Sequence, residues 1–113
     1  MKIIRMLFIA ALAALSVPAA ADLVVVSKAH EVSLENIRLP GSTNGTLSFK
    51  PCETCDYQTV RVTAATRYEA NEQSFDLEAF RKELEGIRNP REETATVLHH
   101  LESDTIVAVQ IIF

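Results

Sequence analysis

This 113-residue chain has two cysteines, Cys52 and Cys55, and they lie between two runs of alternating apolar and polar residues. The runs are residues 46–50 and 59–64, and alternation with period two is typical of half-buried antiparallel strands. Since only a few residues separate the runs, we expect a hairpin that carries the cysteines at its tip. The apolar positions of both runs should face the core, namely Leu47, Phe49, Val60, Val62 and Ala64.

The chain begins with a pattern typical of a cleaved secretory signal peptide, residues 1–21. Lys2 and Arg5 precede an apolar run, and residues 19–21 are alanines, which a signal peptidase accepts. An uncleaved N-terminal anchor is the alternative, because the apolar run is nearly long enough to span a bilayer. Cleavage would leave residues 22–113 as one domain, and we expect this mature protein in the periplasm or secreted.

The net charge of the mature chain argues against two kinds of partner, nucleic acids and anionic membranes. Of the 11 basic and 15 acidic residues, only Lys2 and Arg5 lie in the signal, so the mature chain has 9 basic residues and a net charge of −6. A domain this acidic has no general attraction for phosphate backbones or anionic lipid. No apolar run after Asp22 is long enough to cross a membrane. We therefore expect no nucleic-acid partner and no stable membrane insertion after signal cleavage.

Other parts of the chain before residue 76 also suggest extended structure. Residues 23–26 are a short apolar run that suits a first strand. In residues 31–39 the alternation slips by one position, which is typical of a bulge, so we expect one long or interrupted strand there. Residues 40–45 form a dense turn signal and should be a loop. Residues 67–75 are more polar and are expected to hold a further short strand or an ordered loop.

One helix is predicted after residue 75, where the apolar period changes from two residues to that of a helix. Asp76 is expected to cap its N-terminus and Gly86 to end it, with Pro90 soon after. The positions on its apolar face are Leu77, Phe80, Leu84 and Ile87.

The chain closes with a second predicted hairpin, in which residues 95–101 and 105–113 flank a turn. Within residues 106–113, Gln110 is the only polar residue, so the strand is apolar on both faces. A strand of this kind should lie inside the sheet with cover on each face. The helix can cover one face, and curling of the sheet or a second chain can cover the other. A homodimer through this strand, or an envelope protein, is the expected partner.

Together these patterns predict a single α+β domain over residues 22–113. It should contain a small, mostly antiparallel sheet of four to six strands with one helix packed on a face.

Cys52 and Cys55 are assigned to a structural disulfide. An exported protein meets an oxidising compartment, and the chain has no other cysteine. A loop this short contributes about 2 kcal/mol in the chain-entropy treatment of disulfides.

Two other chemistries stay open for the cysteines. A zinc or copper site would combine Cys52 and Cys55 with a histidine, His99 or else His30 or His100. The ligand types suit these metals, but the ligand count falls short. A thiol–disulfide redox centre would need an activated thiolate, which the acidic neighbours Glu53 and Asp56 disfavour.

No set of residues points to catalysis. The chain has no nucleophile motif of the Gly-x-Ser-x-Gly kind, and its acidic clusters are typical of solvated surface. We therefore expect a non-catalytic binding or accessory module without a cofactor, stabilised by the Cys52–Cys55 disulfide. A metal-binding protein and a thiol–disulfide redox protein are the alternatives.

Overall fold

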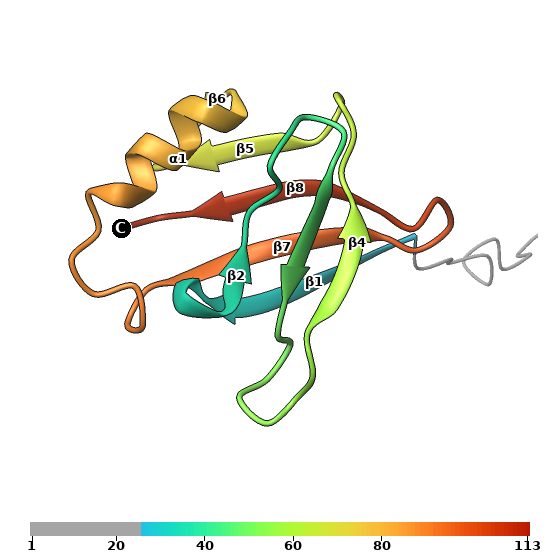
Figure 1. Ribbon diagram of the computed structural model, residues 1–113, viewed down its shortest axis with the longest axis horizontal. Coiled ribbons are helices and arrows are strands. Elements are labelled where there is room, and N and C mark those ends of the chain that lie inside the picture. Colours follow the sequence, from blue (N-terminus) through green and yellow to red (C-terminus); the bar gives the residue numbers. More distant parts are fainter. Residues whose placement is uncertain (1–25) are drawn as a thin grey trace, which may run out of the picture.

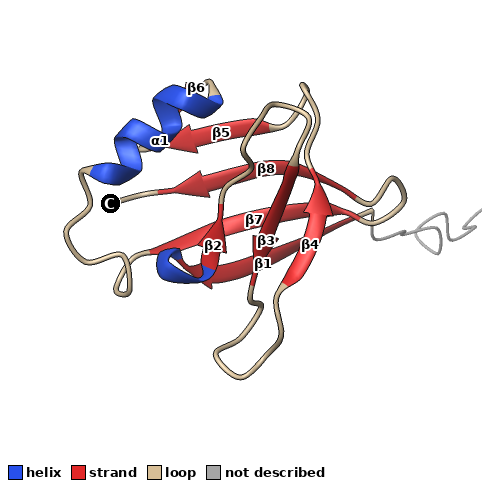
Figure 2. Cartoon of the chain, viewed as in Figure 1, coloured by secondary structure: helices blue, strands red, loops and turns tan. Residues whose placement is uncertain are grey.

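The computed structural model describes residues 26–113, in which one mixed sheet carries a helix (Figure 1, Figure 2). The predicted signal peptide, residues 1–21, and residues 23–25 of the predicted first strand lie outside the described residues. The elements in chain order are β1 (Ser27–Ser33), the 3-10 helix η3 (Leu34–Asn36), β2 (Ile37–Arg38), β3 (Thr46–Phe49), β4 (Gln58–Arg61), β5 (Arg67–Ala70), β6 (Gln73–Phe75), α1 (Leu77–Glu85), β7 (Thr94–His100) and β8 (Thr105–Ile111).

The described residues form eight strands rather than the predicted four to six. The predicted strand over residues 31–39 is interrupted by η3, so the slip in alternation marks a helical turn and not a bulge. Residues 67–75 form two strands, β5 and β6. The turn between them places Asn71 and Glu72 at φ values of 51° and 68°, in the left-handed region.

The sheet runs in the order β1-β7-β8-β4-β3-β2, and β5 pairs with β8 beside β4 and also with β6. Strand β8 is antiparallel to β7 but parallel to β4 and β5, which makes the sheet mixed. This confirms the interior position predicted for the last strand. Both of its edges have neighbours within the chain, while Ile112 and Phe113 beyond it are exposed. The homodimer or envelope contact through this strand stays a prediction.

The two ends of this strand order come together because the sheet curls. Strands β1 and β2 stand at opposite ends of the order, yet only the three residues of η3 separate them in the chain. In addition, the ring of His30 on β1 lies 4.9 Å, centroid to centroid, from that of Phe49 on β3. Either curling of the sheet or a second chain was expected to cover the second face of the last strand. The curl therefore covers much of that face within one chain.

The predicted cysteine hairpin is confirmed, with Leu47 opposite Val60 and Phe49 opposite Gln58. Leu47, Phe49, Val60 and Val62 are buried, as predicted. The prediction for Ala64 is wrong because the alternation stops after Val62. There Thr66 Oγ1 accepts a hydrogen bond from the Thr63 amide at 3.0 Å, and the resulting turn leaves Ala64 exposed.

The predicted helix is also confirmed. Asp76 caps it, since its Oδ1 accepts a hydrogen bond from the Ala79 amide at 2.8 Å. Gly86 ends the helix with a right-handed φ of −77°. Phe80 is fully buried, and its ring centroid lies 5.4 Å from that of Tyr68 on β5. Other apolar side chains of this segment face the core, namely Leu77, Leu84 and Ile87.

Candidate functional site

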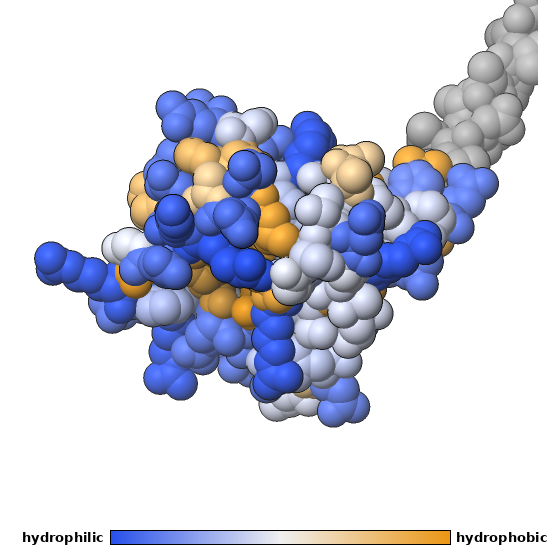
Figure 3. Space-filling model, turned by 45° about the horizontal axis from the view of Figure 1, so that its top comes forward, coloured by the Kyte–Doolittle hydropathy of each residue, from blue (hydrophilic) through white to orange (hydrophobic). Residues whose placement is uncertain are grey.

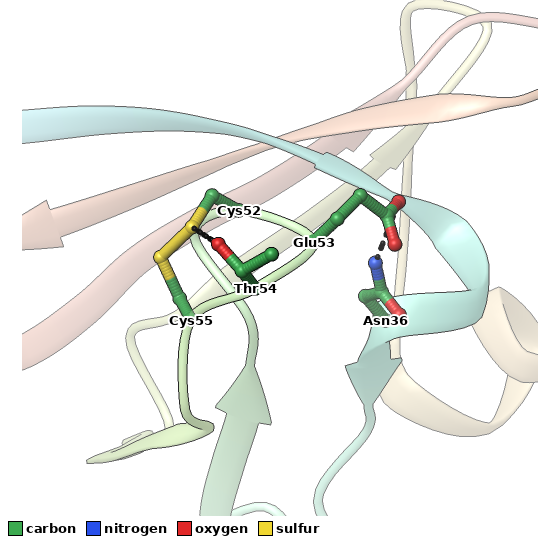
Figure 4. Close-up of a disulfide and its surroundings, with 5 residues drawn as sticks. All are labelled: Asn36, Cys52, Glu53, Thr54 and Cys55. Atoms are coloured by element: carbon green, nitrogen blue, oxygen red, sulfur yellow. Dashed lines mark hydrogen bonds between the residues drawn. A yellow bond between two sulfur atoms is a disulfide. The ribbon is translucent and has the colours of Figure 1, made fainter.

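Cys52 and Cys55 lie in the loop that joins β3 to β4, and their sulfur atoms are at disulfide-bonding distance (Figure 4). The Cα atoms are 5.0 Å apart, and the Cys55 amide donates a hydrogen bond to the Cys52 carbonyl at 3.1 Å. The hydroxyl of Thr54 is 3.7 Å from the Cys52 sulfur. The only α-helix of residues 26–113 starts elsewhere, at Leu77, so no helix terminus activates either sulfur. This geometry suits a clamp across a tight turn.

The loop is tied to the segment around β2. Asn36, which is buried, donates from Nδ2 to Glu53 Oε1 at 3.4 Å (Figure 4). Tyr57, just beyond the cysteines, has the Arg38 guanidinium 4.2 Å and the Lys50 ammonium 5.6 Å from its ring centroid. These contacts hold the hairpin tip against η3 and β2.

His99 and His100 lie at the end of β7, beside the β7–β8 turn. His99 on β7 has its Nε2 2.7 Å from Asp104 Oδ1 in the β7–β8 turn, and neighbouring His100 accepts a hydrogen bond at Nδ1 from the Ser103 amide at 3.2 Å. In residues 26–113, no three His, Cys, Asp or Glu side chains are arranged to hold a metal ion. The structure therefore does not assemble His99 with the two cysteines, and the metal and redox alternatives stay untested hypotheses.

His30 lies beside His99, on the neighbouring strand β1. Its ring centroid is 6.4 Å from that of His99, and its Nε2 is buried without a hydrogen-bond partner in the described chain. Burial lowers the pKa of His30, and the nearby Lys28 and His99 lower it further. The neutral imidazole is thus the form that suits the folded protein.

An open groove with a mainly apolar lining lies between α1 and the β2 segment. It has a volume of about 400 Å³. On the side of the molecule that carries α1, apolar surface is recessed between hydrophilic side chains (Figure 3). We call this feature the α1–β2 groove. Its apolar lining consists of Leu34, Ile37, Leu39, Leu84 and Pro90, and its charged lining of Glu35, Arg81 and Glu85.

Two of the charged side chains at the groove have partners within the chain. Glu35 Oε1 is 3.5 Å from Nε of the exposed Arg91. The Arg81 guanidinium donates a hydrogen bond to the Pro40 carbonyl. Although Arg81 stands one helical turn before Glu85, no ion pair forms between them. Within residues 26–113, Glu85 has no ion-pair partner.

No family model, curated protein or solved structure matches this chain. Within the described part of the chain, no helix combines the length and the hydropathy needed to cross a bilayer.

Sequence reasoning did not find the α1–β2 groove, because its two walls are distant in the chain. Ile37 and Leu39 follow the slip in alternation after β1, whereas Leu84 belongs to α1. The slip was the available signal, since it moves these side chains away from the phase of β1. Only the fold shows that the displaced residues meet the helix.

Proposed function

We propose that this chain is an exported, non-catalytic binding or accessory module that holds a partner protein in the α1–β2 groove. The observation that carries the proposal is the groove itself, an apolar recess of about 400 Å³ with charged side chains at its edge. Concave apolar sites with a few polar groups around them are the usual form of binding sites on proteins. The fixed Cys52–Cys55 hairpin supports the same role, because it braces the β2 side of the groove.

The partner is proposed to be an envelope protein, since the N-terminal pattern of residues 1–21 favours export. Under this proposal the mature chain begins at Asp22 and is found in the periplasm or outside the cell. Fractionation followed by N-terminal sequencing tests this part. A full-length chain that retains residues 1–21 in the membrane fraction would contradict it.

The binding role is tested by comparing captured proteins between matched leucine variants. Leu84→Ser alters the groove, whereas Leu101→Ser changes an exposed leucine in the β7–β8 turn. Proteins retained from an envelope extract by the wild type and by Leu101→Ser should be lost with Leu84→Ser. Thermal unfolding of each variant shows that it is folded at the assay temperature. Equal retention by folded Leu84→Ser and wild type would contradict the proposal.

A further inference from the structure

Strand β2 offers a free backbone edge beside the α1–β2 groove. It stands last in the strand order and pairs only with β3 (Figure 1). The Lys50 amide donates to the Asn36 carbonyl at 3.1 Å, so the next pair, Ile37 and Phe49, is a non-hydrogen-bonded pair. In such a pair the backbone groups point away from the neighbouring strand. The Ile37 carbonyl is thus directed outward from the sheet.

Within the described chain, two outward backbone groups at this edge are free, the Ile37 carbonyl as an acceptor and the Leu39 amide as a donor. The Ile37 amide is used locally, because it donates to the Leu34 carbonyl. Leu39 is the next residue whose backbone alternates to the same side. Outside the strand ladder, no backbone hydrogen bond of residues 26–113 uses the Ile37 carbonyl or the Leu39 amide. These two groups have the spacing that an added strand requires.

A strand added here would place its side chains in the groove. Directly opposite residues of paired strands point to the same face of the sheet, and Ile37 and Leu39 both line the groove. Alternate side chains of the added segment would therefore lie between β2 and Leu84 of α1. This is the arrangement in which main-chain hydrogen bonds give affinity and side-chain pockets give specificity.

Charge selects among such segments. Glu85 and Arg81 both border the groove, and neither has an ion-pair partner within the described chain. The Arg81 guanidinium is half-buried and held on the Pro40 carbonyl, whereas Glu85 is exposed, and the mature domain is acidic overall. A basic side chain beside the apolar positions would complement this carboxylate, whereas an acidic one would be repelled.

We infer that the α1–β2 groove binds an extended segment of a partner protein, with alternating apolar residues and a flanking Lys or Arg, as an added strand on β2. The inference rests on the proposed binding function and specifies its ligand class. The Ile37 carbonyl and the Leu39 amide pair with the segment's backbone, its apolar side chains contact Leu39 and Leu84, and its basic side chain faces Glu85.

The test uses a defined probe, the acetylated and amidated peptide Lys-Val-Thr-Val-Thr, titrated into the isotope-labelled full domain and followed by amide NMR. Saturable shifts are expected at Leu39 and along the Glu85 turn of α1. A peptide N-methylated along its backbone should lose roughly tenfold in affinity, because it cannot form the hydrogen bonds of the ladder. Replacing the peptide's Lys by Glu should weaken binding.

Matched variants of the protein test the charge. Glu85→Lys should lower the affinity for the Lys peptide by roughly two- to fivefold, the range for an exposed ion pair. The same variant should raise the affinity for the Glu peptide. Glu83→Lys is the control, since Glu83 is exposed on α1 but does not line the groove. Equal effects of both variants would overturn the charge assignment.

The results also separate this inference from the proposed function. No saturable shift up to millimolar peptide, shifts confined to another surface, or equal affinity of the N-methylated peptide would overturn strand addition. If Leu84→Ser nevertheless loses an envelope partner that Leu101→Ser retains, the groove binds by another mode and the proposed function stands. If capture is also unaffected by Leu84→Ser, both fail.

Discussion

The hydroxyl of Thr66 donates a hydrogen bond to the backbone carbonyl of Ile106 at 2.7 Å, across 40 positions of sequence. Thr66 is buried and lies between β4 and β5, both of which run parallel to β8. The same hydroxyl accepts a hydrogen bond from the Thr63 amide. The Thr66 side chain therefore fixes the connection between β4 and β5 against β8.

Replacing Thr66 by Val should lower the free energy of unfolding by about 1–3 kcal/mol. The substitution keeps the shape but leaves the Ile106 carbonyl and the Thr63 amide without their partner. Thr66→Ser is the control, because it keeps the hydroxyl and should cost less. Urea denaturation of the three proteins measures the difference. Equal stability of Thr66→Val and wild type would show that the bond contributes nothing.

Tyr68 should tolerate loss of its hydroxyl. The hydroxyl is buried under α1 and has no hydrogen-bond partner in the described chain. Burial raises the pKa of Tyr68, an effect that Arg81 partly offsets. Tyr68→Phe is therefore expected to leave the free energy of unfolding unchanged or to increase it by up to about 1 kcal/mol. A decrease of that size would mean that the hydroxyl has a partner in solution.

Stability should fall in acid in a way that depends on His30. Its pKa is lowered in the folded protein from the ordinary 6.5, so the unfolded chain binds the proton more readily. The stabilising contribution of neutral His30 is present above pH 6.5 and is lost as the pH falls through the lower folded-state pKa. His30→Gln should reduce the loss of unfolding free energy between pH 7.5 and pH 5, as followed by denaturation at each pH. An unchanged pH dependence in this variant would contradict the assignment.

Reduction of the Cys52–Cys55 pair should lower the free energy of unfolding by about 2 kcal/mol, the value expected for so short a loop. The double variant Cys52→Ser, Cys55→Ser should match the reduced wild type and should not respond to reductant. Denaturation with and without reductant measures both effects. Two free thiols in protein isolated under oxidising conditions would refute the disulfide.

Local periodicity predicted those elements whose partners are close in sequence. The cysteine hairpin, α1 and the β7–β8 hairpin all follow from alternation or helical spacing over a few residues. The β5–β6 turn was not evident, because Asn71 and Glu72 adopt left-handed backbone without a glycine to signal it. The break in the predicted strand over residues 31–39 was visible as a slip, but a bulge and a 3-10 turn produce the same slip.

The order of the strands depends on contacts that no local pattern contains. The parallel pairings of β8 with β4 and β5 join segments about 40 residues apart, and the closeness of β1 and β2 depends on the curl of the whole sheet. The groove has the same origin, since Leu39 and Leu84 meet only after these pairings form. The alternating runs predict which side chains are buried better than they predict what lies beside them.

Site-specific photo-crosslinking in the native cell shows whether the α1–β2 groove holds a protein partner. A photoreactive residue replaces Glu85 at the groove, and in a second protein it replaces Glu102 in the β7–β8 turn; both positions are exposed. Irradiation should give a discrete heavier adduct from position 85 and none from position 102. No adduct from position 85, or the same adduct from both positions, would contradict the claim.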